Sequence, residues 1–257
     1  MNRRKILMAF LTMLLFTSAQ CGEVMFQAST IDALMQGVYD GTMTFGELKK
    51  HGDFGLGTVN ALDGEMIALD GKFYQGLADG KILPLKNGAK TPFASMTFFQ
   101  ADAAWTARGT QSFAQLQKSI DERLPSENLF YAIRITGTFS VVKLRSVPRQ
   151  SRPYRPLDQV VKTQSEFELH SIQGTLVGFR CPPFVKGVNV PGYHFHFISS
   201  DGTKGGHVLG CSIRNAAIQM DTLSTFEMVL PKNRSFLKTD LSEHRAEALR
   251  VVEQGAR

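Results

Sequence analysis

The pattern of apolar and polar positions predicts a few short helices among many strands. Residues 30–39 (TIDALMQGVY) place their apolar side chains at the spacing of one helix face. Capping boxes at 44–47 (TFGE) and 112–115 (SFAQ) predict the starts of two further helices, because the paired side chains satisfy the first free amides. The helix that starts at 112–115 must end before Pro125. A terminal helix is expected from Asp240 to about Glu253.

Between these helices the chain has the composition and alternation of β-strands. Asp-Gly pairs at 63–64, 70–71 and 79–80 divide the stretch 54–85 into an antiparallel meander, because Asp-Gly favours tight hairpin turns. Its predicted core residues are Ile67, Leu69, Phe73, Tyr74 and Ile82. Further strands are expected at 91–99, at 129–147 as two segments hinged near Gly137, and at 166–172, 174–180, 213–219 and 226–230.

This order of elements predicts the α+β class, with mostly antiparallel or mixed sheets and few helices. The stretch 147–157 (VPRQSRPYRPL) is rich in proline and arginine and is interpreted as an extended crossing segment. We expect two β-rich halves on either side of it. The first is an α+β half over residues 25–150, and the second is a metal-binding half over residues 151–257.

The stretch 191–210 (PGYHFHFISSDGTKGGHVLG) contains three of the six histidines. His194 and His196 are two residues apart on a predicted strand, so both side chains point to the same face. If the turn of a hairpin lies at Asp201-Gly202, the pairing register places His196 opposite His207. One hairpin would therefore gather three imidazoles around one point, which predicts a metal site.

Three imidazoles with an open coordination position are typical of catalytic zinc, and other divalent metals remain possible. The alternative is an aromatic strand with an incidental pair of histidines. Cys211 is a conceivable fourth ligand that a three-histidine site does not need. Cys181 and Cys211 could pair in an oxidising compartment, but two buried thiols are the favoured interpretation.

The N-terminus has the pattern of a secretory signal peptide over residues 1–20. Arg3, Arg4 and Lys5 precede a short apolar run and small residues, and the run is too short for a comfortable membrane span. We therefore expect export to the periplasm or the medium, with no stable membrane span in the mature chain. A lipid anchor at Cys21 fits the usual signal poorly. The same three basic residues supply half of the formal charge of +6, so the charge gives no reason to expect a nucleic-acid partner.

Several long runs of the sequence resemble one known family. The runs are FGLGTVNALDGEMIALDGKFYQ, TPFA, LFYAIRITGTFSVVKLRSVPRQSRPY, QSEFEL, GTLVGF, NVPGYHFHFIS and GGHVLG, and they occur in the family's order. They resemble the bacterial alpha-acetolactate decarboxylases from about Phe26 to the C-terminus. The resemblance implies a lyase that converts 2-acetolactate to acetoin and carbon dioxide with Zn²⁺ as its cofactor. It also implies a homodimer, as in the family's enzymes.

The resemblance also implies roles for individual residues. It assigns the zinc to His194, His196 and His207, the same three that the hairpin register selects. It assigns catalysis to Glu65 in LDGEM, Arg145 in KLRSVP and Glu253 near the C-terminus, and substrate contacts to Thr58 in GLGTVN and to Arg145. Whether Glu253 ligates the metal, relays protons or closes the site is left open.

Two other classes of protein are compatible with the histidine pattern. A cupin-like metalloenzyme acting on another small oxo or hydroxy acid also carries two histidines on one strand. In that pattern a glutamate follows four or five residues later, where this chain has Ser200 and Asp201. A non-catalytic exported metal-binding protein would need neither Glu65 nor Arg145.

Overall fold

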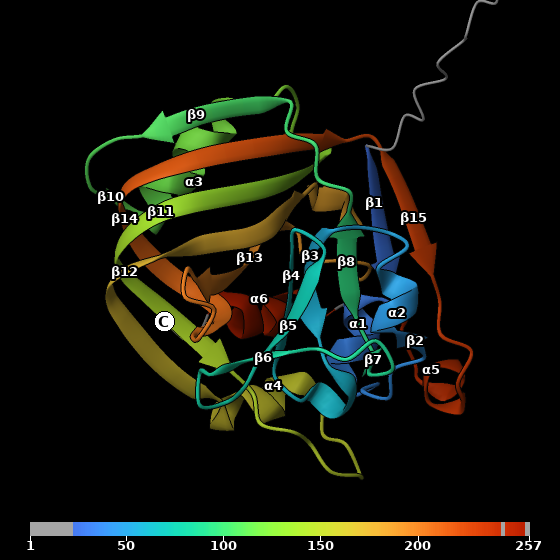
Figure 1. Cartoon of the computed structure of the whole chain (residues 1–257). Coiled ribbons are helices and arrows are strands. Elements are labelled where there is room, and N and C mark those ends of the chain that lie inside the picture. Colours follow the sequence, from blue (N-terminus) through green and yellow to red (C-terminus); the bar gives the residue numbers. More distant parts are fainter. Residues whose placement is uncertain (1–22, 243–244, 255–257) are drawn as a thin grey trace, which may run out of the picture.

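The computed structural model describes residues 23–242 and 245–254, which form two large sheets with short helices at their ends (Figure 1). Nearly all strand pairs are antiparallel, and β1 and β15 form a parallel pair. This confirms the predicted α+β class. The predicted signal peptide at 1–20 and Cys21 lie outside the described residues. Among the described residues no helix is long and apolar enough to cross a membrane.

The first sheet has seven strands in the order β15, β1, β8, β3, β4, β5 and β6. Their bounds are β1 Val24–Ala28, β3 Phe54–Thr58, β4 Glu65–Leu69, β5 Lys72–Gly76, β6 Ile82–Pro84, β8 Ala94–Thr97 and β15 Thr225–Val229. Strands β3 to β6 are the antiparallel meander that the Asp-Gly pairs predict. Of its predicted core residues, Ile67 and Phe73 are buried, whereas Leu69, Tyr74 and Ile82 are half-buried.

The second sheet is strongly curved and is built around three long strands. Its order is β10, β14, β11, β12 and β13, and β9 also pairs with β14. The bounds are β9 Ala103–Ala107, β10 Gln111–Ser112, β11 Phe130–Ser146, β12 Ser165–Cys181, β13 Gly192–Ser199 and β14 Gly205–Leu223. Strands β13 and β14 pair again at their hairpin, so β11, β12, β13 and β14 form a closed ring of neighbours.

Two predicted breaks in this sheet are wrong. Residues 130–146 form one strand rather than two segments hinged at Gly137, and residues 166–180 likewise belong to one strand. A Cβ on Gly137 would lie 2.2 Å from the Asn215 carbonyl oxygen. Glycine at this position therefore allows the neighbouring strand to approach closely, and the strand continues through it. The bend comes instead from register shifts between β11 and β14.

The helices are shorter than the sequence pattern predicts. α1 covers only Ile31–Met35. It ends just before Gly37, whose left-handed backbone conformation (φ +84°) is typical of the residue that follows a helix. Both predicted capping boxes are present, at the starts of α2 (Phe45–Leu48) and α3 (Phe113–Asp121). The expected terminal helix begins later, as α6 (Ala246–Gln254). The remaining elements are α4 Leu157–Val160, α5 Arg234–Lys238, β2 Met43–Thr44, β7 Lys90–Thr91, and the 3₁₀ helices η1 Asn60–Leu62, η2 Val161–Thr163 and η3 Pro183–Val185.

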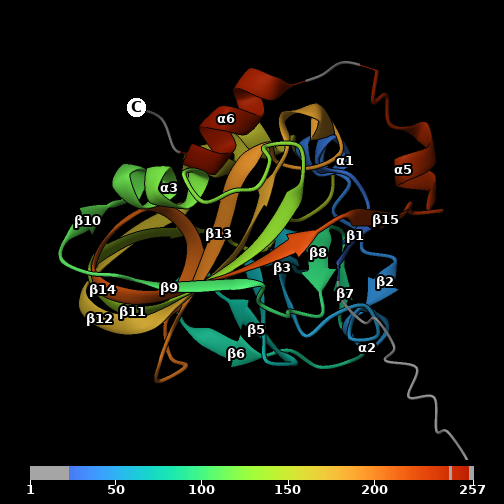
Figure 2. The same ribbon diagram turned by 90° about the horizontal axis from the view of Figure 1, so that it is seen from above.

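The two sheets pack against each other through a shared apolar core. Phe54, Leu56 and Ile67 of the first sheet belong to one cluster with Val177 and Phe179 of the second. Each such side chain contributes about 1.5–3 kcal/mol when it is buried. Each sheet takes strands from both sides of residue 150, because β9 to β11 lie in the second sheet and β15 lies in the first. Figure 2 shows α3 and α6 together along one side of the molecule, near β13.

Candidate metal centre

The histidine hairpin has the register that the sequence predicts. β13 and β14 pair with His196 opposite His207. The turn is longer than the two residues expected, because the Ser199 amide donates to the Lys204 carbonyl at 2.8 Å and residues 200–203 form the loop. Lengthening the loop by one residue on each side leaves the register unchanged. Asp201 accepts from the Thr203 amide at 3.0 Å within this turn, so it stabilises the loop.

The three histidines lie at one point in the interior. The potential ligand atoms of His194, His196 and His207 all lie within 4.8 Å of one another. Each ring also has one buried nitrogen without a hydrogen-bond partner among the described residues, namely Nδ1 of His194, Nε2 of His196 and Nδ1 of His207. Buried polar atoms without partners are costly, and a shared cation would satisfy them. The donor set therefore fits a divalent metal such as zinc.

The surrounding structure holds the rings in orientation and keeps them neutral. His196 Nδ1 donates to the Met66 carbonyl of β4 at 2.8 Å, which leaves the lone pair of Nε2 available. His207 Nε2 donates to the Glu253 carbonyl of α6 at 3.0 Å. Burial, reinforced by the Arg145 guanidinium, lowers the pKa of His194 to about 3. Burial likewise holds the pKa of His196 and of His207 well below the usual range, so all three rings are neutral, as metal ligands must be.

A buried arginine connects two carboxylates beside the histidines. Arg145 of β11 donates through Nη1 to Glu65 Oε1 at 2.9 Å, and its Nη2 lies 4.0 Å from Glu253 Oε1. Glu65 Oε2 lies 3.4 Å from His196 Nε2, and Glu253 Oε2 lies 3.5 Å from His194 Nε2. Each carboxylate therefore has one oxygen near the arginine and one oxygen near a histidine.

Both carboxyl groups hold their protons more tightly than usual. Burial raises the pKa of Glu65 to about 7, although Arg145 acts in the opposite direction. Burial also raises the pKa of Glu253 to about 7, again against the attraction of Arg145. The cost of removing each carboxylate from water thus exceeds the gain from one shared guanidinium. At neutral pH both groups are poised to exchange protons.

Thr58 and Glu65 face each other across a strained turn. They are register partners at the ends of β3 and β4, and the Thr58 hydroxyl donates to the Gly64 carbonyl at 2.7 Å. Ala61 and Leu62, inside the turn, both have positive φ, at 62° and 54°. Buried non-glycine residues rarely adopt this conformation, and such strain is concentrated at functional sites. Here Leu62 is one of the residues that line the small space at the histidines.

Two spaces meet at the histidines, a small inner chamber and a large outer cavity. The inner chamber has a volume of about 30 Å³ and the outer cavity about 810 Å³. The inner chamber is lined by the polar side chains of Thr58, Glu65, Arg145, His194, His196, His207 and Glu253, and by Ile31, Leu34, Gly57, Leu62, Phe93, Val147 and Leu157. His194, His207 and Glu253 line both spaces, so they form the partition between them.

The structure thus brings all seven predicted site residues together, while their roles stay predictions. The sequence reasoning did not find the apolar wall of the inner chamber or the Met66 carbonyl that orients His196. The wall comes from α1, the β3–β4 turn, the loop before β8, the end of β11 and α4, and no local pattern connects these segments. A backbone carbonyl carries no side-chain signal at all. Cys181 and Cys211 are buried free thiols, as favoured, and neither belongs to the histidine group.

The fold and the centre define an α+β protein with an enclosed three-histidine site, flanked by an arginine and two proton-exchanging carboxyl groups. Comparison with known proteins agrees with this class. The family model for alpha-acetolactate decarboxylase matches residues 25–243. The chain is 50% identical over 228 residues to the alpha-acetolactate decarboxylase of Methylococcus capsulatus, covering 89% of this chain and 88% of that protein. It belongs to the alpha-acetolactate decarboxylase family.

Solved structures give the same assignment. The crystal structure of alpha-acetolactate decarboxylase from Bacillus subtilis strain 168 superposes with a TM-score of 0.88 at 39% identity, covering 90% of this chain and 99% of that one. A Staphylococcus aureus protein described as similar to alpha-acetolactate decarboxylase superposes with a TM-score of 0.86 at 35% identity, covering 90% of this chain and 100% of that one. The family model ends before α6, so the position of Glu253 at the site comes from the fold itself.

Proposed function

We propose that this protein decarboxylates 2-acetolactate to acetoin and carbon dioxide with zinc as its metal. One observation carries the proposal. Three neutral, buried imidazoles with ring nitrogens that lack partners lie beside a buried Arg145–Glu65 pair, in a chain of this family. The metal supports electron withdrawal, the arginine supports carboxylate binding, and the carboxyl group supports proton delivery, which are the three needs of this reaction.

His194, His196 and His207 would hold the zinc ion. When bound by three neutral ligands, zinc keeps its double positive charge and supplies a Lewis acid for the oxygen atoms of the substrate. Breaking the bond between the carboxyl carbon and its neighbour releases carbon dioxide and leaves an electron pair. The adjacent ketone accepts that pair. No organic cofactor is needed for this electron flow.

Arg145 is suited to orient the carboxylate that leaves. Its Nη1 is committed to Glu65, but its Nε is buried and has no hydrogen-bond partner. A guanidinium offers paired donors that match a carboxylate, so the free edge of Arg145 can hold this group in a fixed orientation. The orientation matters because the breaking bond must lie perpendicular to the plane of the ketone for the electron pair to be delocalised.

Glu65 is suited to deliver the proton that completes the reaction. The carbon that loses carbon dioxide must gain one proton to give acetoin. With a pKa of about 7, Glu65 is partly protonated at neutral pH, and its Oε2 points towards the histidines at 3.4 Å from His196 Nε2. Glu253 has a matching pKa on the opposite side of the centre and can restore or relay that proton. The strained turn with Thr58 keeps Glu65 in place.

The apolar wall of the inner chamber keeps bulk water away from the reacting atoms. A space of about 30 Å³ accommodates roughly one water molecule, so a substrate with nine non-hydrogen atoms would reach Arg145 and Glu65 with part of its atoms and extend beyond this space. The substrate therefore approaches from the outer cavity, which His194, His207 and Glu253 also line.

The test is an acetoin colour assay on added 2-acetolactate. Purified protein should form acetoin, a chelator should abolish the activity, and zinc should restore it. His194→Ala should lose both bound metal and activity. His170→Ala is the matched control, because His170 is exposed on β12 and lies outside the centre. Metal binding without acetoin formation would favour the non-catalytic metal-binding alternative. Activity on another oxo or hydroxy acid would favour the cupin-like alternative.

We further propose export after cleavage near residue 20 and assembly as a homodimer. The export proposal rests on the basic and apolar pattern of the first residues. N-terminal sequencing of secreted protein tests the cleavage position, and size-exclusion chromatography with light scattering tests the dimer.

A further inference from the structure

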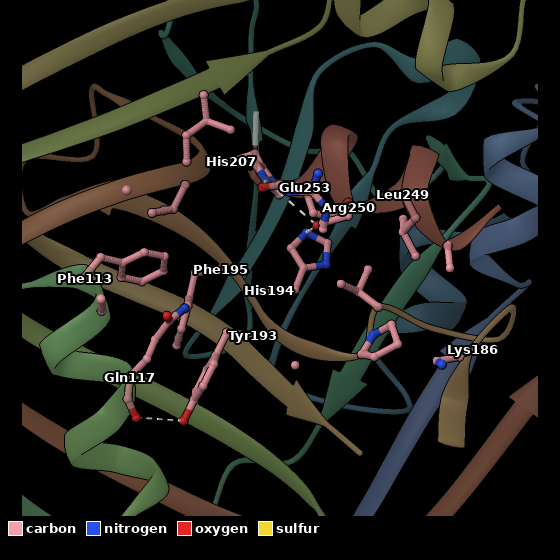
Figure 3. Close-up of a pocket in the computed structure, with 18 of the residues that line it drawn as sticks. Phe113, Gln117, Lys186, Tyr193, His194, Phe195, His207, Leu249, Arg250 and Glu253 are labelled. Atoms are coloured by element: carbon pink, nitrogen blue, oxygen red, sulfur yellow. Dashed lines mark hydrogen bonds and ion pairs between the residues drawn. The ribbon is translucent and has the colours of Figure 1, made fainter. Parts of the chain in front are cut away.

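The outer cavity is far larger than the reaction at the metal centre requires. It lies between α3, α6 and the ends of β13 and β14, and its volume is about 810 Å³ (Figure 3). Phe113, Tyr193 and Phe195 line one side, Arg250 lies beside Glu253, and Lys186 lies apart from both, away from the aromatic side (Figure 3). The cavity thus has an aromatic wall and a basic wall, and it leads to the partition formed by the histidines and Glu253.

The basic wall follows one face of α6. Ala246, Leu249, Arg250 and Glu253 all line the cavity, and their spacing is that of a single helix face. Arg250 is therefore one turn away from Glu253 along the path to the metal centre. Its partner Glu247 is exposed and does not line the cavity. Arg250 donates to both oxygens of Glu247, from Nε at 3.1 Å and from Nη2 at 2.6 Å, so this solvent-exposed pair screens part of the charge of Arg250 and leaves the rest to the cavity.

Two further cations complete the wall. Arg245 precedes α6 and donates to the amide oxygen of Gln36 through Nε at 2.8 Å and Nη2 at 3.1 Å, with the amide oriented to accept. This partner is neutral, so the hydrogen bonds to Gln36 do not cancel the charge of Arg245. Lys186, after η3, is exposed at the cavity wall. The carboxylates among the lining residues are Asp32 and Glu253, and both are buried.

We propose that Lys186, Arg245 and Arg250 form a cationic entrance that concentrates the anionic substrate in front of the metal centre. The inference rests on the proposed function, since that substrate carries a carboxylate and both products are neutral. The lining has three cationic side chains against the two buried carboxyl groups of Asp32 and Glu253, and a cleft with an excess of one sign of charge raises the local concentration of the opposite charge and speeds its capture. Acetoin and carbon dioxide have no net charge, so the same wall does not retain them. The entrance acts on arrival of the substrate and takes no part in bond breaking.

The experiment compares steady-state kinetics of the wild type with the double variant Lys186→Gln/Arg250→Gln. Arg245 is left in place because it also tethers α6 to Gln36. The double variant should lose about three- to tenfold in kcat/KM with kcat nearly unchanged, because only capture is impaired. Raising the salt concentration from about 20 mM to about 500 mM should lower kcat/KM of the wild type and narrow the difference. Arg234→Gln, on α5 and exposed, is the matched control and should behave like the wild type.

A charge-retaining variant separates charge from packing. Lys186→Arg/Arg250→Lys should keep most of the wild-type kcat/KM, with the same thermal midpoint. Loss in this variant equal to that in the glutamine variant would overturn the inference, because side-chain shape would then explain both. Equal kcat/KM and equal salt dependence in the wild type and the glutamine variant would also overturn it. A wild type that forms no acetoin would instead refute the proposed function.

Discussion

Replacing Glu65 with glutamine should abolish turnover and yet stabilise the metal-free protein. Glutamine has the shape of a protonated glutamate, and its oxygen can still accept the hydrogen bond from Arg145 Nη1, now 2.9 Å long. It has no proton to deliver to the reacting carbon. Loss of a general acid costs about 10²–10⁴-fold in rate, so kcat should fall by that factor while bound zinc is retained.

The stability gain follows from the raised pKa of Glu65. Its folded-state pKa of about 7 lies above the ordinary glutamate value of 4.5, so the folded protein holds the proton more tightly than the unfolded chain does. Stability from this group is therefore complete below about pH 4.5 and is lost as the pH rises towards about 7. The difference of about 2.5 pKa units corresponds to about 3 kcal/mol as an upper estimate. Glutamine does not ionise, so the Glu65→Gln variant does not lose this stability as the pH rises.

Two opposing effects act on the stability of the Glu65→Gln variant. Removing one partner of a buried ion pair usually destabilises by about 3–5 kcal/mol, because a charge is left unpaired. Here burial outweighs the attraction of Arg145, and Glu253 remains near the same guanidinium. Urea unfolding of the chelated protein should therefore show little difference at pH 5 and a more stable variant at pH 8. A variant that is less stable at pH 8, or that turns over normally with zinc bound, would refute the reasoning.

Three further outcomes follow from the same geometry. Burial raises the pKa of Asp221 from 3.8 to about 6, so the contribution of this group to stability falls as the pH rises through this interval. Asp221→Asn should therefore add about 1–3 kcal/mol to the free energy of unfolding at pH 8 and almost none at pH 4. An equal gain at both pH values would contradict this. Gly64 has φ +81°, and a Cβ there would lie 2.2 Å from the Gly76 carbonyl oxygen. Gly64→Ala should therefore lower the free energy of unfolding by about 2–4 kcal/mol in chemical denaturation. An unchanged denaturation midpoint would show that the turn can relax. Arg145→Lys keeps the charge but loses the paired donors, so KM for 2-acetolactate should rise about 10- to 100-fold in steady-state assays; a KM within twofold of the wild type would argue against its carboxylate role.

Local features of the fold could be predicted because their signals lie close together in the sequence. Asp201-Gly202 sets the hairpin register that brings His196 opposite His207, even though the loop is longer than expected. The two capping boxes start helices where predicted, because hydroxyl and carboxylate or amide groups satisfy free amides within one turn. Such devices need only a few neighbouring residues to act.

Features that depend on distant packing were predicted less well. Glycines at 137 and 174 suggested breaks, but a Cβ at either position would collide with the neighbouring strand, so they allow continuous strands to pack closely. The position of Glu253 against His207 depends on where α6 docks, and no spacing in the sequence encodes that docking. The family resemblance, rather than periodicity, pointed to Glu65, Arg145 and Glu253.

The origin of the ligands in a single hairpin separates two stages in the maturation of the enzyme. His194, His196 and His207 belong to adjoining strands, so all three possible ligands come from one local piece of the chain. The acid, the guanidinium and the last carboxyl group come from β4, β11 and α6, which must converge from remote regions. Under the proposed function, a molecule truncated before α6 would keep the three histidines and lack Glu253, so it should bind a metal ion and yet form no acetoin.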